Sequence, residues 1–301
     1  MDILPLLKNV LEEGFIYGIM VMGVYITYQI LDFPDLSVDG TFPLGGCVTA
    51  VLITLGVSPW LACLLAFAAG AAAGCVTGVL HVKLRVTDLL SGIIVMTALL
   101  SLNMVVLGGV QGKAVLQFFN QPTIFTSAPV SLLPPALYRY RVLLLSGLLA
   151  LGTKLVMDAF LRTKCGLLLR AAGDNPQFVT ALAQDQGRMK ILGLAIGNGC
   201  TALAGSVLAQ QAENASTAIG TGMVVQALAA VIIGMNLFGR LKALRPTTMV
   251  LMGTVVYKAI LLLAMLWLPS TFLKLAMAAL FVITLVAERA SRKRKGGPQH
   301  V

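Results

Sequence analysis

Long apolar segments separated by short polar connections run through the whole chain. About 20 apolar residues are enough to cross a bilayer as a helix, and the chain has about nine such segments. The pattern predicts an all-α polytopic membrane protein. The expected spans are Gly14–Ile30, Phe42–Gly56, Pro59–Leu80, Leu89–Gly109, Val142–Leu161, Ile191–Gln211, Met223–Phe238, Thr247–Leu266 and Phe272–Ala287.

Residues 1–13 are short and of mixed polarity, which favours an interfacial helix before the first span. No polar stretch is long enough for a soluble domain, which typically needs at least about 50 residues. We therefore expect residues 1–301 to form one transmembrane domain.

One polar segment, Leu31–Gly46, interrupts the apolar pattern early in the chain. It carries three aspartates, two prolines and three glycines. Such a segment is not a regular lipid-facing helix, because lipid offers no partner for freed backbone groups. It is either a loop in water or a broken, re-entrant element buried among other helices, and broken helices at membrane depth mark substrate paths in transporters.

The longest polar interruption is Thr163–Lys190. Leu167–Ala172 and Phe178–Gln184 are predicted to form short helices on the membrane face, on either side of a Gly-Asp-Asn-Pro turn. Pro176 disfavours a helical conformation at Asn175, and Gly173 is expected to supply a positive φ at the turn. A polar insertion of this size between spans is a place where a partner docks.

Lysines and arginines follow the membrane topology. Of the 22, fifteen lie in residues 81–88, 162–190, 239–246 and 289–295, whereas the alternate connections hold three. The positive-inside bias then places the insertion and the basic tail 289–301 in the cytoplasm. It also explains the net charge of +10 without a nucleic-acid partner. The side of the N-terminus depends on whether Leu31–Gly46 completes a crossing.

Composition agrees with a membrane protein and argues against an enzyme. The chain is 58% hydrophobic and 11% charged, less than half the charge of a typical soluble domain. It contains no P-loop, no HExxH or GxSxG motif, and two histidines, so no catalytic residues are expected. The five cysteines form no CxxC pair, and neither a metal site nor a disulfide framework is expected.

Polar residues within or beside the spans are candidates for a substrate path or gate. Lys258 lies deep in its span, where a charge costs about 2.5–3.5 kcal/mol unless it faces protein or water. Its expected partners are Asp35, Asp39 or Glu213, in a structural ion pair or a substrate site. Glycines 70, 74 and 78 form a small-residue face that favours tight helix packing within one subunit. The path or gate candidates are Asp35, Ser37, Asp39, Asn103, Gln210, Gln211, Asn214, Ser216 and Lys258.

Three stretches resemble one transporter family. CGLLLRAAGDNPQFVTALAQDQGRMK is similar to the cytoplasmic signature of ABC-transporter permeases of the branched-chain amino acid/ribose type. DFPDLSVDGTFPLGG and QQAENASTAIGTGMVVQALAAVIIGMNLFG resemble the polar motif and the glycine-rich region of that family. The polar motif looks most like a subgroup of tryptophan/tyrosine or general amino-acid permeases.

The resemblance implies an importer subunit in a bacterial inner membrane. Two permease copies form a dimer, separate ATPases bind ATP and Mg below it, and an extracytoplasmic binding protein delivers an amino acid above it. No cofactor is implied for the chain itself. The implied ATPase-coupling residues are Gly166, Arg170, Ala171, Gly173, Asp174, Asn175 and Pro176.

Two other functions stay open on the residues alone. An ion-coupled secondary transporter or channel would explain the buried charge, although it has no need of the polar insertion. A purely structural membrane scaffold would tolerate the replacement of Asp39 or Lys258.

Overall fold

A computed structural model gives the fold. It describes residues 3–128, 130, 134–175, 177, 185–239, 241, 244–267 and 269–294. In that part of the chain, seven helices are long and apolar enough to cross a membrane. Val38–Thr54 and Lys274–Val286 are shorter apolar helices. The all-α polytopic fold is therefore confirmed, whereas nine complete crossings remain a prediction.

The elements follow the hydrophobic pattern in chain order. The long helices are α1 (Ile3–Val24), α2 (Val38–Thr54), α3 (Pro59–Val82), α4 (Asp88–Gly108), α6 (Arg141–Phe160), α9 (Gln186–Ala212), α10 (Met223–Phe238), α11 (Pro246–Trp267) and α12 (Leu273–Arg294). Between them lie the π-helix η1 (Tyr25–Ile30), the 3-10 turns η2 (Gly109–Gln111), η4 (Thr217–Gly220) and η5 (Ser270–Phe272), and the helices α5 (Pro135–Tyr138) and α7 (Lys164–Asp174). The described strands, β1 (Val115–Gln117) and β2 (Asn214–Ser216), pair antiparallel.

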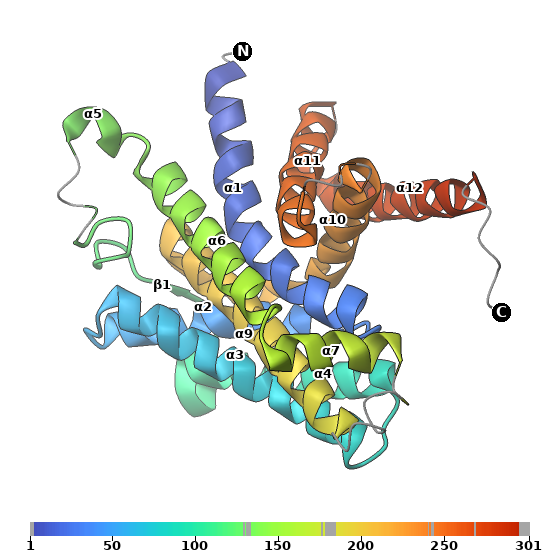
Figure 1. Ribbon diagram of the computed structural model, residues 1–301. Coiled ribbons are helices and arrows are strands. Elements are labelled where there is room, and N and C mark those ends of the chain that lie inside the picture. Colours follow the sequence, from blue (N-terminus) through green and yellow to red (C-terminus); the bar gives the residue numbers. More distant parts are fainter. Residues whose placement is uncertain are drawn as a thin grey trace.

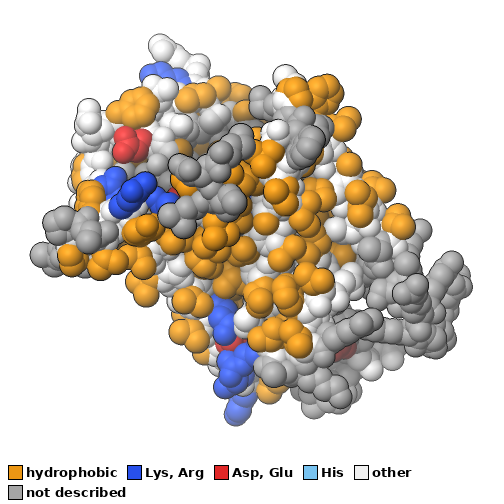
Figure 2. Space-filling model, turned by 90° about the horizontal axis from the view of Figure 1, so that it is seen from above, with side chains coloured by type: hydrophobic (Ala, Val, Ile, Leu, Met, Phe, Trp, Pro, Cys, Tyr) orange, Lys and Arg blue, Asp and Glu red, His pale blue; other side chains and the backbone are white. Residues whose placement is uncertain are grey.

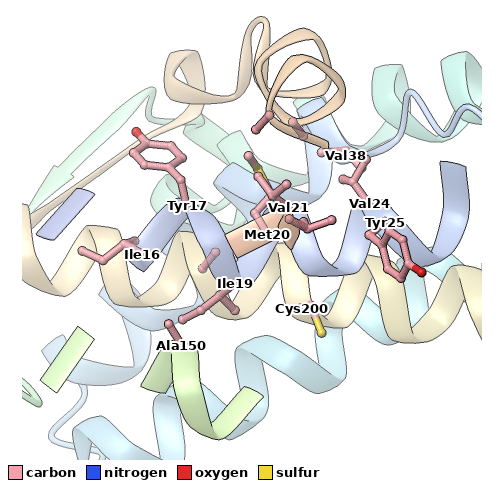
Figure 3. Packing of buried hydrophobic residues seen from close by; sticks show 14 of the residues in the cluster. Ile16, Tyr17, Ile19, Met20, Val21, Val24, Tyr25, Val38, Ala150 and Cys200 are labelled. Atoms are coloured by element: carbon pink, nitrogen blue, oxygen red, sulfur yellow. The ribbon is translucent and has the colours of Figure 1, made fainter. Parts of the chain in front are cut away.

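The centre of the bundle is formed by α1 and α9, whose spans are 83% and 72% buried. Ile16, Ile19 and Met20 of α1 are fully buried there, with Ala150 of α6 and Cys200 of α9 close by (Figure 3). On one side of this centre lie α2, α3 and α4, and on the other lie α10 and α11, with α12 projecting outward (Figure 1). Outer helices present hydrophobic side chains over a broad surface, with lysines and arginines toward its edges (Figure 2), as a bilayer requires.

The first span begins earlier than predicted. Residues 3–30 form one continuous helical segment, α1 followed by η1, so the expected separate interfacial helix at 1–13 is wrong. Two acidic residues, Glu12 and Glu13, lie within this helical segment. Glu12 pairs with Lys8 at 3.5 Å, and Glu13 pairs with Lys258 at 3.1 Å. Side-chain pairing within protein removes the cost that lipid would impose.

The polar segment Leu31–Gly46 is a broken element inside the bundle, as one of its two predicted alternatives required. An irregular connection joins η1 to α2, and α2 starts at Val38, four residues before the predicted start. Phe33, Asp35 and Ser37 in the connection are all buried. The early start of α2 is possible because its polar first turn meets protein on every side.

The glycine face of α3 packs within the subunit, as predicted. A Cβ atom at Gly70 would overlap Asn198 and Ala202 of α9, and one at Gly74 would overlap the carbonyl of Leu194. At Gly78, it would approach the Cα of Ile191 to 2.8 Å. The backbones of α3 and α9 therefore touch along three turns, which only residues without a Cβ permit.

Candidate functional site

The helix α7 lies across the ends of the bundle helices and matches the first helix predicted in the insertion. The side chain of Thr163 caps it by accepting a hydrogen bond from the Gly166 N–H at 3.3 Å. Leu169 and Ala172 are buried against the bundle, whereas Leu167 is 56% exposed. An exposed leucine on a polar face is available to a partner groove.

The other predicted coupling residues are distributed over both faces of α7. Gly166 is buried, Ala171 is half-buried, and Arg170, Asp174 and Asn175 are exposed. Asn175 has the extended conformation expected of a residue before proline (φ −148°, ψ 93°). Pro176 and the predicted helix Phe178–Gln184 lie outside the described residues.

Gly173 has a different role from the predicted one. It lies within α7 and is not among the residues of positive φ, so the expected left-handed turn is wrong. Its space is filled by another backbone. A Cβ atom there would overlap the carbonyl oxygen of Ile30, the last residue of η1. The glycine is needed because α7 and η1 approach each other too closely for a side chain.

Several basic connections converge on the α7 face of the molecule. Lys190 at the start of α9 lies 3.2 Å from Nε2 of His81 at the end of α3. Arg245, before α11, donates to Asp158 at the end of α6 at 2.9 Å. The loops that were predicted to be cytoplasmic are therefore on one side of the bundle.

Asp35, Ser37 and Asn198 form a buried polar cluster between the η1–α2 connection and α9. The Ser37 N–H donates to Asp35 Oδ1 at 2.8 Å, and Asn198 Nδ2 donates to Asp35 Oδ2 at 2.6 Å. The hydroxyl of Ser37 donates to Asn198 Oδ1 at 3.1 Å. Each of the three side chains is at most 4% exposed. The sequence singled out two of them, and Asn198 is the partner that folding supplies.

Asp39 occupies the first turn of α2 and caps the start of α10. Its carboxylate accepts hydrogen bonds from the Gly222 N–H at 3.0 Å and from the Val224 N–H at 2.8 Å. The first N–H groups of a helix lack partners within the helix, and a carboxylate also offsets the partial positive charge there. The broken segment Leu31–Gly46 and the glycine-rich connection before α10 thus meet through one aspartate.

Of the remaining polar candidates on this side, Asn214 and Ser216 line a small hollow. Asn103 Nδ2 donates to the Gly40 carbonyl at 3.0 Å, and Gln211 is half-buried. Asn214 and Ser216 belong to β2, beside a small hollow that is partly open to solvent. Apolar groups dominate its wall, which is formed by Phe42, Pro43, Gly46, Gly205, Leu208, Ala209, Ala212, Asn214, Ala215, Ser216 and Ile219.

The side chain of Gln210 anchors the connection between α4 and α6, which contains Ile124. Its Oε1 accepts a hydrogen bond from the Ile124 N–H at 2.9 Å, and its Nε2 lies 3.1 Å from the Cys63 sulfur. Ile124 and Phe125 are buried in the main hydrophobic core. The long proline-containing connection after α4 therefore inserts into the bundle and does not lie only on the membrane surface.

We expect Gln210→Ala to loosen this insertion. Leaving a buried N–H without its acceptor costs about 1–3 kcal/mol, and each 1.4 kcal/mol is about tenfold in an opening equilibrium. Hydrogen–deuterium exchange of the Ile124 amide should therefore accelerate by about tenfold or more. Gln211→Ala at the neighbouring position is the control. Equal exchange in the wild type and Gln210→Ala would show that the bond does not hold the loop.

Lys258 has a partner other than those expected. Its ammonium lies 3.1 Å from Glu13 Oε2 and 3.4 Å from the centre of the Tyr17 ring. The prediction of Asp35, Asp39 or Glu213 is wrong because the extended α1 brings Glu13 alongside α11. In the sequence, Glu13 could have been identified as a partner because its carboxylate lies within one helical turn of an apolar segment.

Asp158 is a further residue that the sequence analysis missed. It accepts hydrogen bonds from Arg245 and Thr247 and forms an ion pair with Lys154 at 3.3 Å. The cluster ties the end of α6, which leads directly into α7, to the start of α11. An acid inside the predicted span Val142–Leu161 was the available signal.

Several known proteins similar to this chain are transport permeases. A tyrosine transport system permease protein of Clostridioides difficile (strain R20291) is 37% identical over 280 residues, 92% of this chain and 89% of that protein. The ribose import permease protein RbsC of Escherichia coli (strain K12) is 25% identical over 232 residues, 76% of this chain and 68% of that protein. No solved structure matches the chain.

The family described as the permease component of the branched-chain amino acid transport system matches residues 6–287. That range includes α7, the Asp35 cluster and the Asp39 cap. This chain therefore belongs to the branched-chain amino acid transport permease family of ABC importers.

Proposed function

We propose that this chain is the membrane-spanning subunit of a binding-protein-dependent ABC importer and forms the path of an amino acid, aromatic or branched-chain. The family supports a permease, and the most extensive similarity described above is to a tyrosine transport permease. The choice of cargo rests on this similarity, and the lining of the small hollow beside β2 is mostly apolar. Selection of the amino acid belongs largely to the binding protein, which is a separate chain.

The observation that carries the proposal is the placement of α7. It lies on the face where basic connections converge, its inner side is packed on η1 and α9, and its outer side presents Leu167 and Arg170. A helix held rigidly on its inner side transmits a push on its outer side. An autonomous transporter has no need for such a surface.

The partners follow from this geometry. Separate ATPase subunits that hold ATP and Mg dock on α7, and the binding protein docks on the opposite face, near β1 and β2. A second copy of the chain completes the path, lipid covers the outer helices, and the chain itself binds no cofactor. In a bacterial inner membrane, the basic C-terminus is cytoplasmic. Lys8 of α1 donates to the carbonyl of Arg139 at 2.9 Å, so α1 begins on the side opposite α7.

Co-purification tests the proposal. The wild-type permease should retain its cognate ATPase in detergent, and Arg170→Glu should weaken this retention by at least about tenfold, because loss of a hot-spot arginine at an interface costs about 2 kcal/mol or more. Lys113→Glu, a reversal of an exposed cation on the opposite face, is the matched control.

Uptake by reconstituted liposomes gives the second readout. With ATPase, ATP and binding protein present, labelled tyrosine or leucine should accumulate. Uptake by the permease alone, with no ATPase retained, would identify an ion-coupled transporter or channel instead. Retention of the ATPase without transport of either amino acid would overturn the choice of cargo, and the proposed importer function would stand.

A further inference from the structure

The end of η1 lies between α7 and the buried Asp35 cluster. The carbonyl of Ile30 fills the space where Gly173 of α7 would carry a side chain. The side chains of Leu31 and of Leu169 in α7 both approach Gly193 of α9. A displacement of α7 therefore acts first on residues 30 and 31, because close-packed groups transmit strain.

The segment between these contacts and α2 has irregular but defined hydrogen bonding. The Leu31 N–H donates to the Ile26 carbonyl at 3.0 Å, and the Phe33 N–H donates to the Thr27 carbonyl at 2.8 Å. The bond from Leu31 to Ile26 spans five residues and is of the π type, which is rare and often marks functional positions, whereas the bond from Phe33 to Thr27 spans six. A change from π to α hydrogen bonding would shift the following residues by one position, which is about 1.5 Å along the axis and about 100° around it.

Asp35 is an ionisable group inside the bundle, and its hydrogen-bond partners are neutral. None of the ion pairs among the described residues involves Asp35, although its carboxylate is buried and accepts hydrogen bonds from Ser37 and Asn198. A buried charge is costly unless every hydrogen bond is in place. The cluster thus fixes the η1–α2 connection to α9 in one arrangement. A contact that served only to stabilise the fold could be made by an apolar pair without such hydrogen bonds.

Asp35, in the irregular connection, lies four residues before Asp39 in the first turn of α2. Because Asp39 holds the Gly222 and Val224 N–H groups, a movement of the connection displaces the start of α10 as well. Ser216 and Ile219, which lie just before the start of α10, line the small hollow. The contacts form an unbroken series from α7 to the wall of the proposed path.

We propose that residues Ile30–Asp39 are the mechanical link between α7 and the start of α10, with Asp35, Ser37 and Asn198 as positioning residues that keep this link rigid. Their role is to pass on movement, and they do not contact the cargo. The inference rests on the proposed function, because it takes movement of α7 to be driven by an ATPase.

The test uses a fluorescent label at each end of the link. Cys165 on α7 is a native exposed cysteine, and Cys47, Cys63 and Cys200 are buried. One protein, with Cys75→Ser, carries the label on Cys165. A second, with Cys165→Ser and Cys75→Ser, carries it on Ala218→Cys, an exposed position in η4. Both are assembled with the ATPase in nanodiscs, and the emission change on adding ATP and orthovanadate is measured.

In the wild-type background we expect both labels to respond. Asp35→Asn should keep the Cys165 response and reduce the Ala218→Cys response by at least fivefold. The exchange Asp35→Asn with Asn198→Asp should restore it in part, because the bond between the two side chains can form in the reverse direction, whereas the bond from Asn198 to the Leu194 carbonyl is lost. Ser37→Ala, which removes the hydroxyl that donates to Asn198 and keeps the backbone bond to Asp35, should give an intermediate loss and serves if Asp35→Asn fails to assemble.

Thr49→Val is the matched control. Thr49 donates to Ser206 at 2.7 Å, so this substitution removes another buried bond between α2 and α9, away from the link. It should leave both responses unchanged. An Ala218→Cys response that persists in Asp35→Asn and Ser37→Ala, or that Thr49→Val reduces equally, would overturn the link. Absence of a Cys165 response in the wild type would instead refute the ATPase-driven function.

Discussion

Gly173→Val is expected to abolish coupling between ATP hydrolysis and transport while the protein remains in the membrane. The reason is steric. The Ile30 carbonyl occupies the space that any side chain at position 173 would need, so α7 must tilt away from η1. Overpacking of this kind typically costs about 1–3 kcal/mol, and about 1.4 kcal/mol corresponds to tenfold in rate.

The measurement is ATP hydrolysis and tyrosine uptake in the reconstituted complex. Uptake should fall by about tenfold or more, and hydrolysis should no longer respond to the loaded binding protein. Gly152→Val in α6 is the control, since nothing lies within 4 Å of a Cβ atom there. If Gly173→Val transported as well as Gly152→Val, close contact between α7 and η1 would not matter for coupling.

Removal of the Glu13 charge should destabilise the protein more than removal of the Lys258 charge. The side chain of Lys258 is 7% exposed, whereas that of Glu13 is 46% exposed. Glu13→Gln leaves a buried ammonium without its counter-charge, and loss of one partner of a buried pair costs about 3–5 kcal/mol. Because Glu13 is partly exposed, we expect Glu13→Gln to lower the free energy of unfolding by about 3 kcal/mol or less.

Lys258→Met leaves a carboxylate whose side chain is 46% exposed and is less enclosed by protein than the Lys258 ammonium, so a smaller loss is expected. The double variant should be close to the wild type, because no unpaired charge remains. Thermal unfolding in lipid nanodiscs measures all three. Arg188→Gln, in an exposed pair with Asp185, is the control and should change stability by at most about 1 kcal/mol. Equal losses for the two single variants would contradict the asymmetry.

The two predictions separate the two regions of the molecule. Gly173 lies where α7 contacts η1, and its variant should impair coupling while the protein stays folded in the membrane, with a loss of stability of about 1–3 kcal/mol. Glu13 and Lys258 join α1 to α11 on the far side of the bundle from the Asp35 cluster, and their variants should change stability first. A substitution with equal effects on coupling and on stability would show that the bundle responds as one rigid body.

The sequence alone was sufficient for the class of protein, the positions of most helices, the insertion that contains α7 and the family. These depend on local properties. Whether a segment of about 20 residues partitions into lipid is decided by its own side chains, and loop charge decides its side of the membrane. Even the packing of Gly70, Gly74 and Gly78 within the subunit could be inferred, because glycine at this spacing has one common use.

Only the tertiary structure decided which polar groups meet. Lys258 and Glu13 are 245 residues apart, and Asp35 and Asn198 are 163 apart, so no local pattern pairs them. The same limit explains Gly173. Its sequence context suggested a turn, but its actual constraint is the carbonyl of Ile30 in another helix. Partition into lipid is a property of single segments, whereas hydrogen bonds and close contacts at membrane depth are properties of packed pairs.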